Sequence, residues 1–124
     1  MKETRRGLAH LSAAAKNSFA GLLCAFRREA AFRQEIFLGV LHFILLAVLP
    51  VSWLERILLT AAWLLWLAVE LLNSAVEEVV DLVSPGWNEF AKRAKDYASA
   101  AVFCAICIFA GGWIALAARI VVSR

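Results

Sequence analysis

The sequence lacks the short motifs by which soluble nucleotide-binding enzymes are usually recognised. Its six glycines do not form a phosphate-binding loop ending in Lys-Ser or Lys-Thr. Neither the catalytic-loop signature of protein kinases nor the Rossmann fingerprint is present. Internal repeats, low-complexity segments and linkers are absent as well, so the 124 residues are expected to form one domain.

Cysteine and proline are also scarce. The three cysteines do not make a disulfide framework, and Cys104 and Cys107 lie in an apolar run, where a thiol packs as a small hydrophobic side chain. We expect them to pack between helices rather than to carry redox or metal chemistry. A cleaved signal peptide is not expected, because the charged stretch runs for about 35 residues before the first long apolar segment.

Apolar residues, in contrast, are in excess. They make up 63% of the chain, above the share usual in soluble domains, so the lipid bilayer is the expected solvent. Of the 13 Lys and Arg residues, seven fall within residues 1–35 and three within 81–96, whereas Arg56 is alone near the turn at 50–56. Because cytoplasmic segments carry the excess of basic residues, we expect the N-terminus and the 81–96 loop in the cytoplasm. The 50–56 turn and the C-terminus should then lie outside.

The hydrophobic pattern predicts an all-α membrane protein, with residues 1–124 in a single domain. Segments 36–54, 57–76 and 97–118 are each about as long as the ~20 residues needed to cross the hydrocarbon layer as a helix. An amphipathic helix is expected over 7–28, where apolar residues recur every three or four positions. Its apolar stripe consists of Leu8, Leu11, Ala15, Phe19, Leu22 and Phe26. This helix either lies in the headgroup layer or packs on the bundle, and the pattern leaves both open.

Glu70 is the most informative single residue, because it falls inside the second span after 13 apolar residues. An ionisable residue within a span is costly and indicates a functional site by default. At 100° per residue, Ser74, Glu77 and Asp81 fall within about 40° of Glu70 around the helix. Asn73 lies about 60° to one side. One helix face therefore carries a column of oxygen ligands that runs from the membrane toward the cytoplasm.

This column predicts a cation site. Stacked carboxylates repel one another unless a cation neutralises them, and Mg²⁺ suits the site because it takes oxygen ligands and commonly bridges carboxylates to phosphates. Five more charged residues near the same boundary complete a polar ring: Glu29, Arg33, Glu35, Lys95 and Asp96. The alternative is that such charges mark the membrane boundary and pair with one another, which is the interpretation adopted for Glu78, Glu89, Lys92 and Arg93. His42, inside the first span, is expected to be a packing residue.

Three separated motifs carry a resemblance to a known family. They are Glu29-Ala-Ala-Phe-Arg-Gln-Glu35, Val69-Glu-Leu-Leu-Asn-Ser-Ala-Val-Glu77, and Arg93-Ala-Lys-Asp96 followed by Ser99-Ala-Ala. In this order and spacing the chain resembles the bacterial integral membrane diacylglycerol kinases over nearly its whole length. The resemblance implies a homotrimer of three-span subunits with an N-terminal surface helix in the bacterial inner membrane. It also implies transfer of the γ-phosphate of ATP to diacylglycerol with Mg²⁺, giving phosphatidic acid, and no nucleic acid partner.

The resemblance further implies roles for single residues. Glu70 would be the general base that takes the proton of the lipid hydroxyl, and Asn73 would order the site. The residues that match nucleotide-binding positions, the first two of them as Mg²⁺ ligands, are Glu29, Glu77, Lys95 and Asp96. The residues that match the lipid-binding face, beside Glu70 itself, are Arg33, Gln34, Glu35 and Ser99.

The chain departs from the family pattern in two places. His10 and Asn17 stand where the family often has Arg and Tyr, and Pro85-Gly86 changes the loop before Asn88. His10, Asn17 and Asn88 are kept as further nucleotide-binding candidates, and the core motifs are unaffected.

Two other functions compete with this interpretation. The nearest is an undecaprenol kinase, which would perform the same chemistry on another lipid alcohol; the motif at residues 29–35 favours diacylglycerol by resemblance. A more distant alternative is a non-enzymatic membrane protein or a proton conduit that uses Glu70 and His42. A conduit would lose transport when Glu70 is changed to Gln and would show no dependence on nucleotide.

Overall fold

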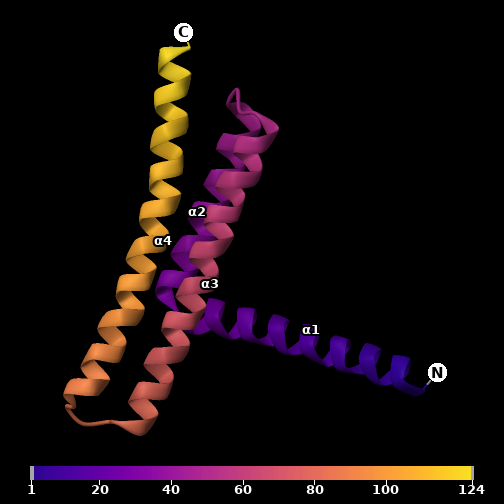
Figure 1. Ribbon diagram of the computed structural model, residues 1–124, viewed down its shortest axis with the longest axis vertical. Helices are drawn as coiled ribbons and strands as arrows, with labels where there is room; N and C mark the ends of the chain where they lie inside the picture. The colour runs from indigo at the N-terminus through magenta and orange to yellow at the C-terminus, as the bar shows by residue number, and fades with distance from the viewer. Residues whose placement is uncertain (1, 124) are drawn as a thin grey trace.

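The computed structural model describes the backbone of residues 2–123 and the side chains of residues 10–123. This part of the chain is helical throughout, with short connections and no strand. Its helices are α1 (Lys2–Arg28), α2 (Ala30–Val48), α3 (Trp53–Val83) and α4 (Glu89–Val122), as Figure 1 shows. The expected all-α membrane fold is confirmed, since α2, α3 and α4 are long and apolar enough to cross a bilayer. Two positions used above, the side chain of Leu8 and the C-terminal residue 124, lie outside the described residues.

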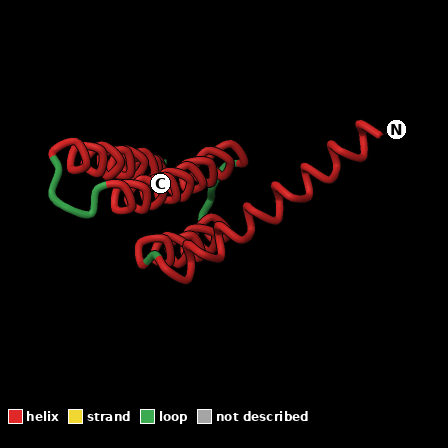
Figure 2. The backbone as a smooth tube through the Cα atoms, turned by 90° about the horizontal axis from the view of Figure 1, so that it is seen from below, coloured by secondary structure: helices red, strands yellow, loops and turns green. Residues whose placement is uncertain are grey.

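Helices α2, α3 and α4 form a bundle, and α1 leaves it. Helices α3 and α4 run side by side, α2 packs against α3, and α1 points away from the other three in both views (Figures 1 and 2). The side chains from residue 10 to residue 24 are all exposed. Residues 10–24 of α1 therefore do not pack on the bundle, which was one of the two expectations for this helix. An exposed amphipathic helix is the form that lies in a headgroup layer.

The helix limits differ from the expected spans at the turn after α2. The apolar segment 36–54 does not form one helix, because α2 ends at Val48 and Leu49 is extended, with φ −87° and ψ 153°. Pro50 explains this break, since the residue before a proline is disfavoured in helical conformation. The next helix begins with a capping box in which the Ser52 hydroxyl accepts from Glu55 N, and Glu55 Oε2 accepts from Ser52 N at 2.8 Å.

The other helices extend beyond the expected spans. Helix α3 continues past residue 76 to Val83, and α4 begins at Glu89, well before residue 97. The polar stretch at 89–96 and the apolar segment after it thus form one continuous helix. As a result, the polar end of the bundle is built on long regular helices, which place side chains more firmly than loops do.

Two buried clusters hold the helices together. The first joins α1, α2 and α3 through Ala25, Phe32 and Leu67, beside the break between α1 and α2. The second joins α2, α3 and α4 through Leu46, Leu59 and Leu116, toward the 49–52 turn. The first cluster fixes the end of α1 next to the middle of α3, where the candidate site lies.

Polar contacts close the bundle at the 49–52 turn. Arg119 Nε on α4 lies 2.6 Å from Glu55 Oε1 on α3, and Arg119 Nη2 donates to Pro50 O at 2.9 Å. Arg56 donates to the carbonyl of Leu46, near the end of α2. This end of the molecule, the turn end, is therefore tied across α2, α3 and α4, while the opposite end at 84–88, the loop end, carries most of the acidic residues.

Candidate functional site

The centre of the candidate site is a buried carboxyl group on α3. Glu70 is 6% exposed, and the charges of Glu77 and Glu29 lie close enough to repel a charge on it. Glu77 is on the same helix face two turns later, as predicted from the helical period. Glu29 comes from the break between α1 and α2, where its extended backbone, with φ −97° and ψ 117°, ends one helix and begins the next. The structure thus places each of the two predicted metal ligands within electrostatic range of the predicted base.

Glu35 is a second buried carboxyl group at this site. It lies on α2, is 3% exposed, and is close enough to Glu70 for the two charges to repel each other. The sequence places Glu35 just before an apolar segment, where an exposed position would be equally plausible. Its deep burial therefore comes from packing against α3.

Asn73 links the column on α3. Its Nδ2 donates to Glu77 Oε1 at 3.4 Å, one turn further along the helix. Its Oδ1 is buried and has no hydrogen-bond partner among the described residues. A buried carbonyl oxygen without a donor is a favourable ligand for a cation or a bound water.

The two predicted nucleotide-binding residues on α4 form ion pairs within the chain. Lys95 Nζ lies 2.5 Å from Asp81 Oδ1 on α3, and it also feels the charge of Glu77. Asp96 pairs instead with Lys92, at 2.6 Å. Lys95 therefore stands beside the acidic column, whereas the Asp96 carboxylate is turned to its own helix.

Three of the predicted lipid-face residues lie near the start of α2, just after the break between α1 and α2, and the fourth lies on α4. Arg33 Nη1 donates to the carbonyls of Phe26 and Arg27, at 3.1 and 3.2 Å, and so caps the end of α1. Arg33 and Gln34 also line a shallow surface hollow on α2. Ser99 is exposed on α4. Of these four residues, Glu35 is the one whose charge acts on Glu70.

The three further nucleotide candidates are not gathered at the site in this chain. His10 and Asn17 are exposed on the part of α1 that points away from the bundle. Asn88 is the N-cap of α4, where its Oδ1 accepts from Phe90 N at 2.8 Å and Ala91 N at 3.1 Å. The structure therefore gives Asn88 a capping role of its own.

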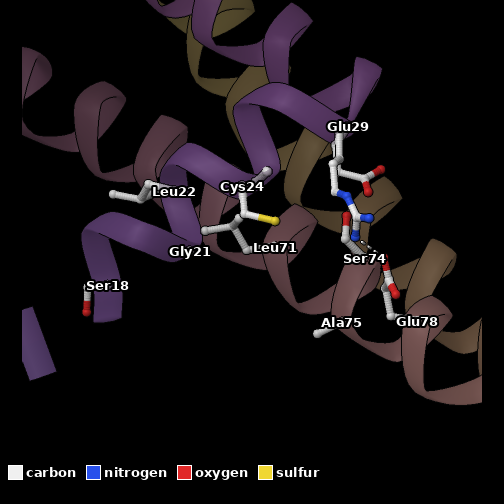
Figure 3. Close-up of a pocket in the computed structure, with 11 residues that line it drawn as sticks. Ser18, Gly21, Leu22, Cys24, Glu29, Leu71, Ser74, Ala75 and Glu78 are labelled. Atoms are coloured by element: carbon white, nitrogen blue, oxygen red, sulfur yellow. Dashed lines mark ion pairs between the residues drawn. The ribbon is translucent and has the colours of Figure 1, made fainter. Parts of the chain in front are cut away.

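A groove of about 550 Å³ opens beside the site between α1 and α3. Its walls are formed by small and apolar residues such as Gly21, Leu22 and Leu71, and its polar end carries Glu29 and Ser74 (Figure 3). An ion pair between Arg28 and Glu78, 3.6 Å apart, closes that end of the groove. Glu78 was expected to be a paired boundary charge, and the structure confirms this pairing.

The donor set fits a hard divalent cation. Among the described residues, no three acidic, His or Cys side chains are close enough to hold a metal by themselves. Two carboxylates and the free Asn73 Oδ1 nevertheless suit an ion such as Mg²⁺, which usually keeps several waters and binds one or two carboxylates together with substrate phosphates.

Sequence reasoning missed two tryptophans near the site. Trp63 Nε1 donates to the backbone carbonyl of Glu35 at 3.1 Å, and Trp66 is buried against the same residue. The spacing of Trp66 in the sequence could have indicated this position, since Trp66 precedes Glu70 by four residues and so lies on the same face of α3. Among apolar neighbours, however, an aromatic residue at that spacing is read as ordinary core.

Comparison with known proteins gives consistent matches. A family model described as prokaryotic diacylglycerol kinase matches residues 16–117. A diacylglycerol kinase of Haemophilus influenzae is 46% identical over 107 residues, which cover 86% of this chain and 91% of the relative. One from Pseudomonas aeruginosa is 47% identical over 107 residues, covering 86% and 87%. One from Escherichia coli is 41% identical over 121 residues, covering 94% and 95%.

Proposed function

This chain belongs to the prokaryotic diacylglycerol kinase family, and from that premise we propose that the Glu70 site transfers the γ-phosphate of ATP to the hydroxyl of diacylglycerol. The enzyme is a membrane-embedded lipid kinase that uses ATP and a divalent metal. The observation that carries the assignment of the site is the burial of Glu70 on a membrane-spanning helix, between the charges of Glu29 and Glu77.

Glu70 acts as the general base. The hydroxyl oxygen of the lipid attacks the γ-phosphorus, the bond to the β-phosphate oxygen breaks to release ADP, and the hydroxyl proton passes to the Glu70 carboxylate. The products are phosphatidic acid and ADP. The buried position of Glu70 supports this role. The hydroxyl of diacylglycerol lies just below the headgroups, where a base at the protein surface would not reach it. Asn73 orders the site through its bond to Glu77.

The phosphate side of the site faces water. Glu29 and Glu77 would hold Mg²⁺, which would neutralise charge on the transferring phosphoryl group. Lys95 places a cation beside the same column, and its pair with Asp81 keeps it there until nucleotide binds. Asp96 contacts the nucleotide after release from Lys92. Positioning and electrostatics of this kind supply most of the catalysis of phosphoryl transfer.

The lipid side of the site lies toward the bilayer. Arg33, Gln34, Glu35 and Ser99 orient the glycerol part of the substrate by hydrogen bonds. The groove between α1 and α3 accepts an acyl chain, because its walls are apolar and its polar end carries Glu29. Diacylglycerol is favoured over undecaprenol by the motif at residues 29–35 and by the relatives, which are named diacylglycerol kinases.

The chain works as a homotrimer in the bacterial inner membrane, with its N-terminus and active site in the cytoplasm. The excess of Lys and Arg at residues 1–35 and 81–96 supports this orientation. Exposed apolar side chains on all three bundle helices support burial against lipid or other subunits.

The test is phosphate transfer from labelled ATP in mixed micelles. The purified chain is given diacylglycerol or undecaprenol, with Mg²⁺ or with a chelator, and compared with Glu70→Gln. Gln has the volume of Glu but cannot take the proton, so kcat should fall by about 10²- to 10⁴-fold while the KM for ATP changes little. Glu89→Gln, at an exposed position in the first turn of α4, is the matched control and should keep full activity.

Each result has a clear meaning. Product from diacylglycerol that is lost in Glu70→Gln, but not in Glu89→Gln, supports both the reaction and the base. Product mainly from undecaprenol would show that undecaprenol, and not diacylglycerol, is the preferred substrate. Full activity of Glu70→Gln would refute the base, and no product from the folded native chain would refute the reaction.

A further inference from the structure

Glu35 is held in the membrane-spanning part of the molecule in an unusual way. Its side chain is 3% exposed, and its Oε2 has no hydrogen-bond partner among the described residues. A buried polar atom without a partner destabilises the fold, so its position must be imposed by stronger neighbouring contacts. The neighbours that impose it are two tryptophans of α3.

Trp63 holds the backbone of Glu35. Its indole Nε1 donates to the Glu35 carbonyl oxygen at 3.1 Å, across 28 positions of sequence. The α2 surface accepts this indole only because Gly39, one turn after Glu35, has no side chain. A Cβ at Gly39 would overlap the Trp63 ring and lie 2.8 Å from its Nε1.

The Trp63 ring is itself fixed from the other side. It stacks on the imidazole of His42, with ring centres 6.3 Å apart and an angle of 18° between the planes, and it meets Phe43 edge to face at 5.4 Å. His42 is 2% exposed and approaches Thr60, with Nε2 and Oγ1 3.4 Å apart. Such contacts leave the Trp63 ring little freedom to turn away from Glu35.

Trp66 faces the carboxyl group of Glu35. It is 9% exposed and close enough to interact with the Glu35 carboxyl group, although its Nε1 makes no hydrogen bond within the described chain. The ring packs against Phe109 of α4, with centres 5.5 Å apart. Because Trp66 precedes Glu70 by one helical turn, the indole and the two carboxyl groups share one face of the α2–α3 contact.

We propose that Trp63 and Trp66 are positioning residues that hold Glu35 against Glu70, and that they thereby set the affinity of the site for the glycerol part of its lipid substrate. This inference rests on the proposed function, because it takes Glu35 as part of the lipid side of the site. Both indoles act through Glu35 and neither touches the nucleotide side. Their loss should therefore affect the lipid and not ATP.

The test compares Trp63→Phe and Trp66→Phe with the native chain in mixed micelles. Phe keeps an aromatic ring and removes the Nε1–H. The KM for diacylglycerol, varied as its mole fraction, should rise about three- to tenfold in Trp63→Phe, the value of one hydrogen bond, with the KM for ATP unchanged. Trp53→Phe, at a position 76% exposed, is the matched control and should leave both KM values unchanged.

A second control separates positioning from loss of stability. Leu59→Ala removes a buried side chain from the cluster near the turn end, so it should lower stability without touching Glu35. If Leu59→Ala raises the KM for diacylglycerol as much as Trp63→Phe does, or if the KM for ATP rises equally, the positioning role is refuted. If Trp63→Phe does not fold, the rise in the KM for diacylglycerol is measured in Trp66→Phe, which replaces the larger ring beside the Glu35 carboxyl group. A native chain without activity on diacylglycerol would refute the proposed function instead, whereas an active chain with unchanged KM values in both variants would refute this inference alone.

Discussion

Replacing Gly39 by alanine should destabilise the fold far more than a methyl group usually does. The added Cβ would overlap the Trp63 ring, lying 2.5 Å from Cε2 and 2.8 Å from Nε1, distances that real Cβ atoms do not show. The ring has no easy escape, because it stacks on His42 and is bonded to the Glu35 carbonyl. Either the ring moves and the hydrogen bond breaks, or α2 moves away from α3.

The magnitude follows from three contributions. Overpacking of a filled contact costs about 1–3 kcal/mol, and loss of the indole hydrogen bond costs about 1 kcal/mol more. Alanine in place of glycine in a helix gains about 1 kcal/mol, which leaves a net loss of about 1–3 kcal/mol. Gly21→Ala is the control, because nothing lies within 4 Å of a Cβ there and only the helix gain applies. The two variants should therefore differ by about 2–4 kcal/mol.

The assay is reversible unfolding by dodecyl sulfate in maltoside micelles, followed by the near-ultraviolet circular dichroism of the tryptophans. Gly112→Ala adds an intermediate case, since its Cβ would meet only the flexible end of Leu59, at 2.8 Å. The double variant Gly39→Ala, Trp63→Leu should recover part of the loss by removing the ring. Equal stability of Gly39→Ala and Gly21→Ala would show that the α2–α3 contact is not formed as described.

Two other predictions concern the ends of the helices. Asn88→Ala should lower the free energy of unfolding by about 1 kcal/mol, because Phe90 N loses its acceptor. Asn88→Asp should keep the native stability, since a carboxylate oxygen can accept the same hydrogen bond. Amide hydrogen exchange in the first turn of α4 measures the difference. A rise in the KM for ATP in both variants would show a nucleotide contact instead. Arg119→Gln should lower the thermal midpoint by releasing Glu55 and Pro50 at the turn end. The KM values for ATP and lipid should not change, since the proposed active site is at the opposite half of α3. An altered KM for ATP would contradict this separation.

The sequence predicts the parts of this fold that depend on local pattern. Three apolar segments and a one-sided helix indicate the helices, and a carboxylate after 13 apolar residues indicates Glu70. Pro50 marks the turn, but the pattern does not reveal that α2 stops at Val48, because the apolar run continues across it. Likewise, the polar and apolar halves of α4 share one helical period, and only the structure shows them as a single helix.

Burial that depends on contacts between helices could not be predicted. Glu35 follows polar neighbours and reads as a boundary residue, yet side chains 28 and 31 positions later enclose it. Lys95 likewise pairs with Asp81 on the neighbouring helix, across the 84–88 loop. No periodicity in the chain encodes either pairing, because each depends on how two helices are set side by side.

The capping box at Ser52 has a consequence for the membrane in which the enzyme works. Helix α3 is continuous from Trp53 through Glu70, so Glu70 lies about 27 Å along the helix axis from its cap at 1.5 Å per residue. The hydrocarbon layer is ~30 Å thick, and the diacylglycerol hydroxyl lies just below the headgroups of its leaflet. Under the proposed orientation, a bilayer a few ångströms thinner moves Glu70 toward the headgroups and a thicker one moves it away from the hydroxyl, unless α3 tilts. The distance between Glu70 and the lipid hydroxyl thus depends on bilayer thickness, because one uninterrupted helix fixes the depth of Glu70.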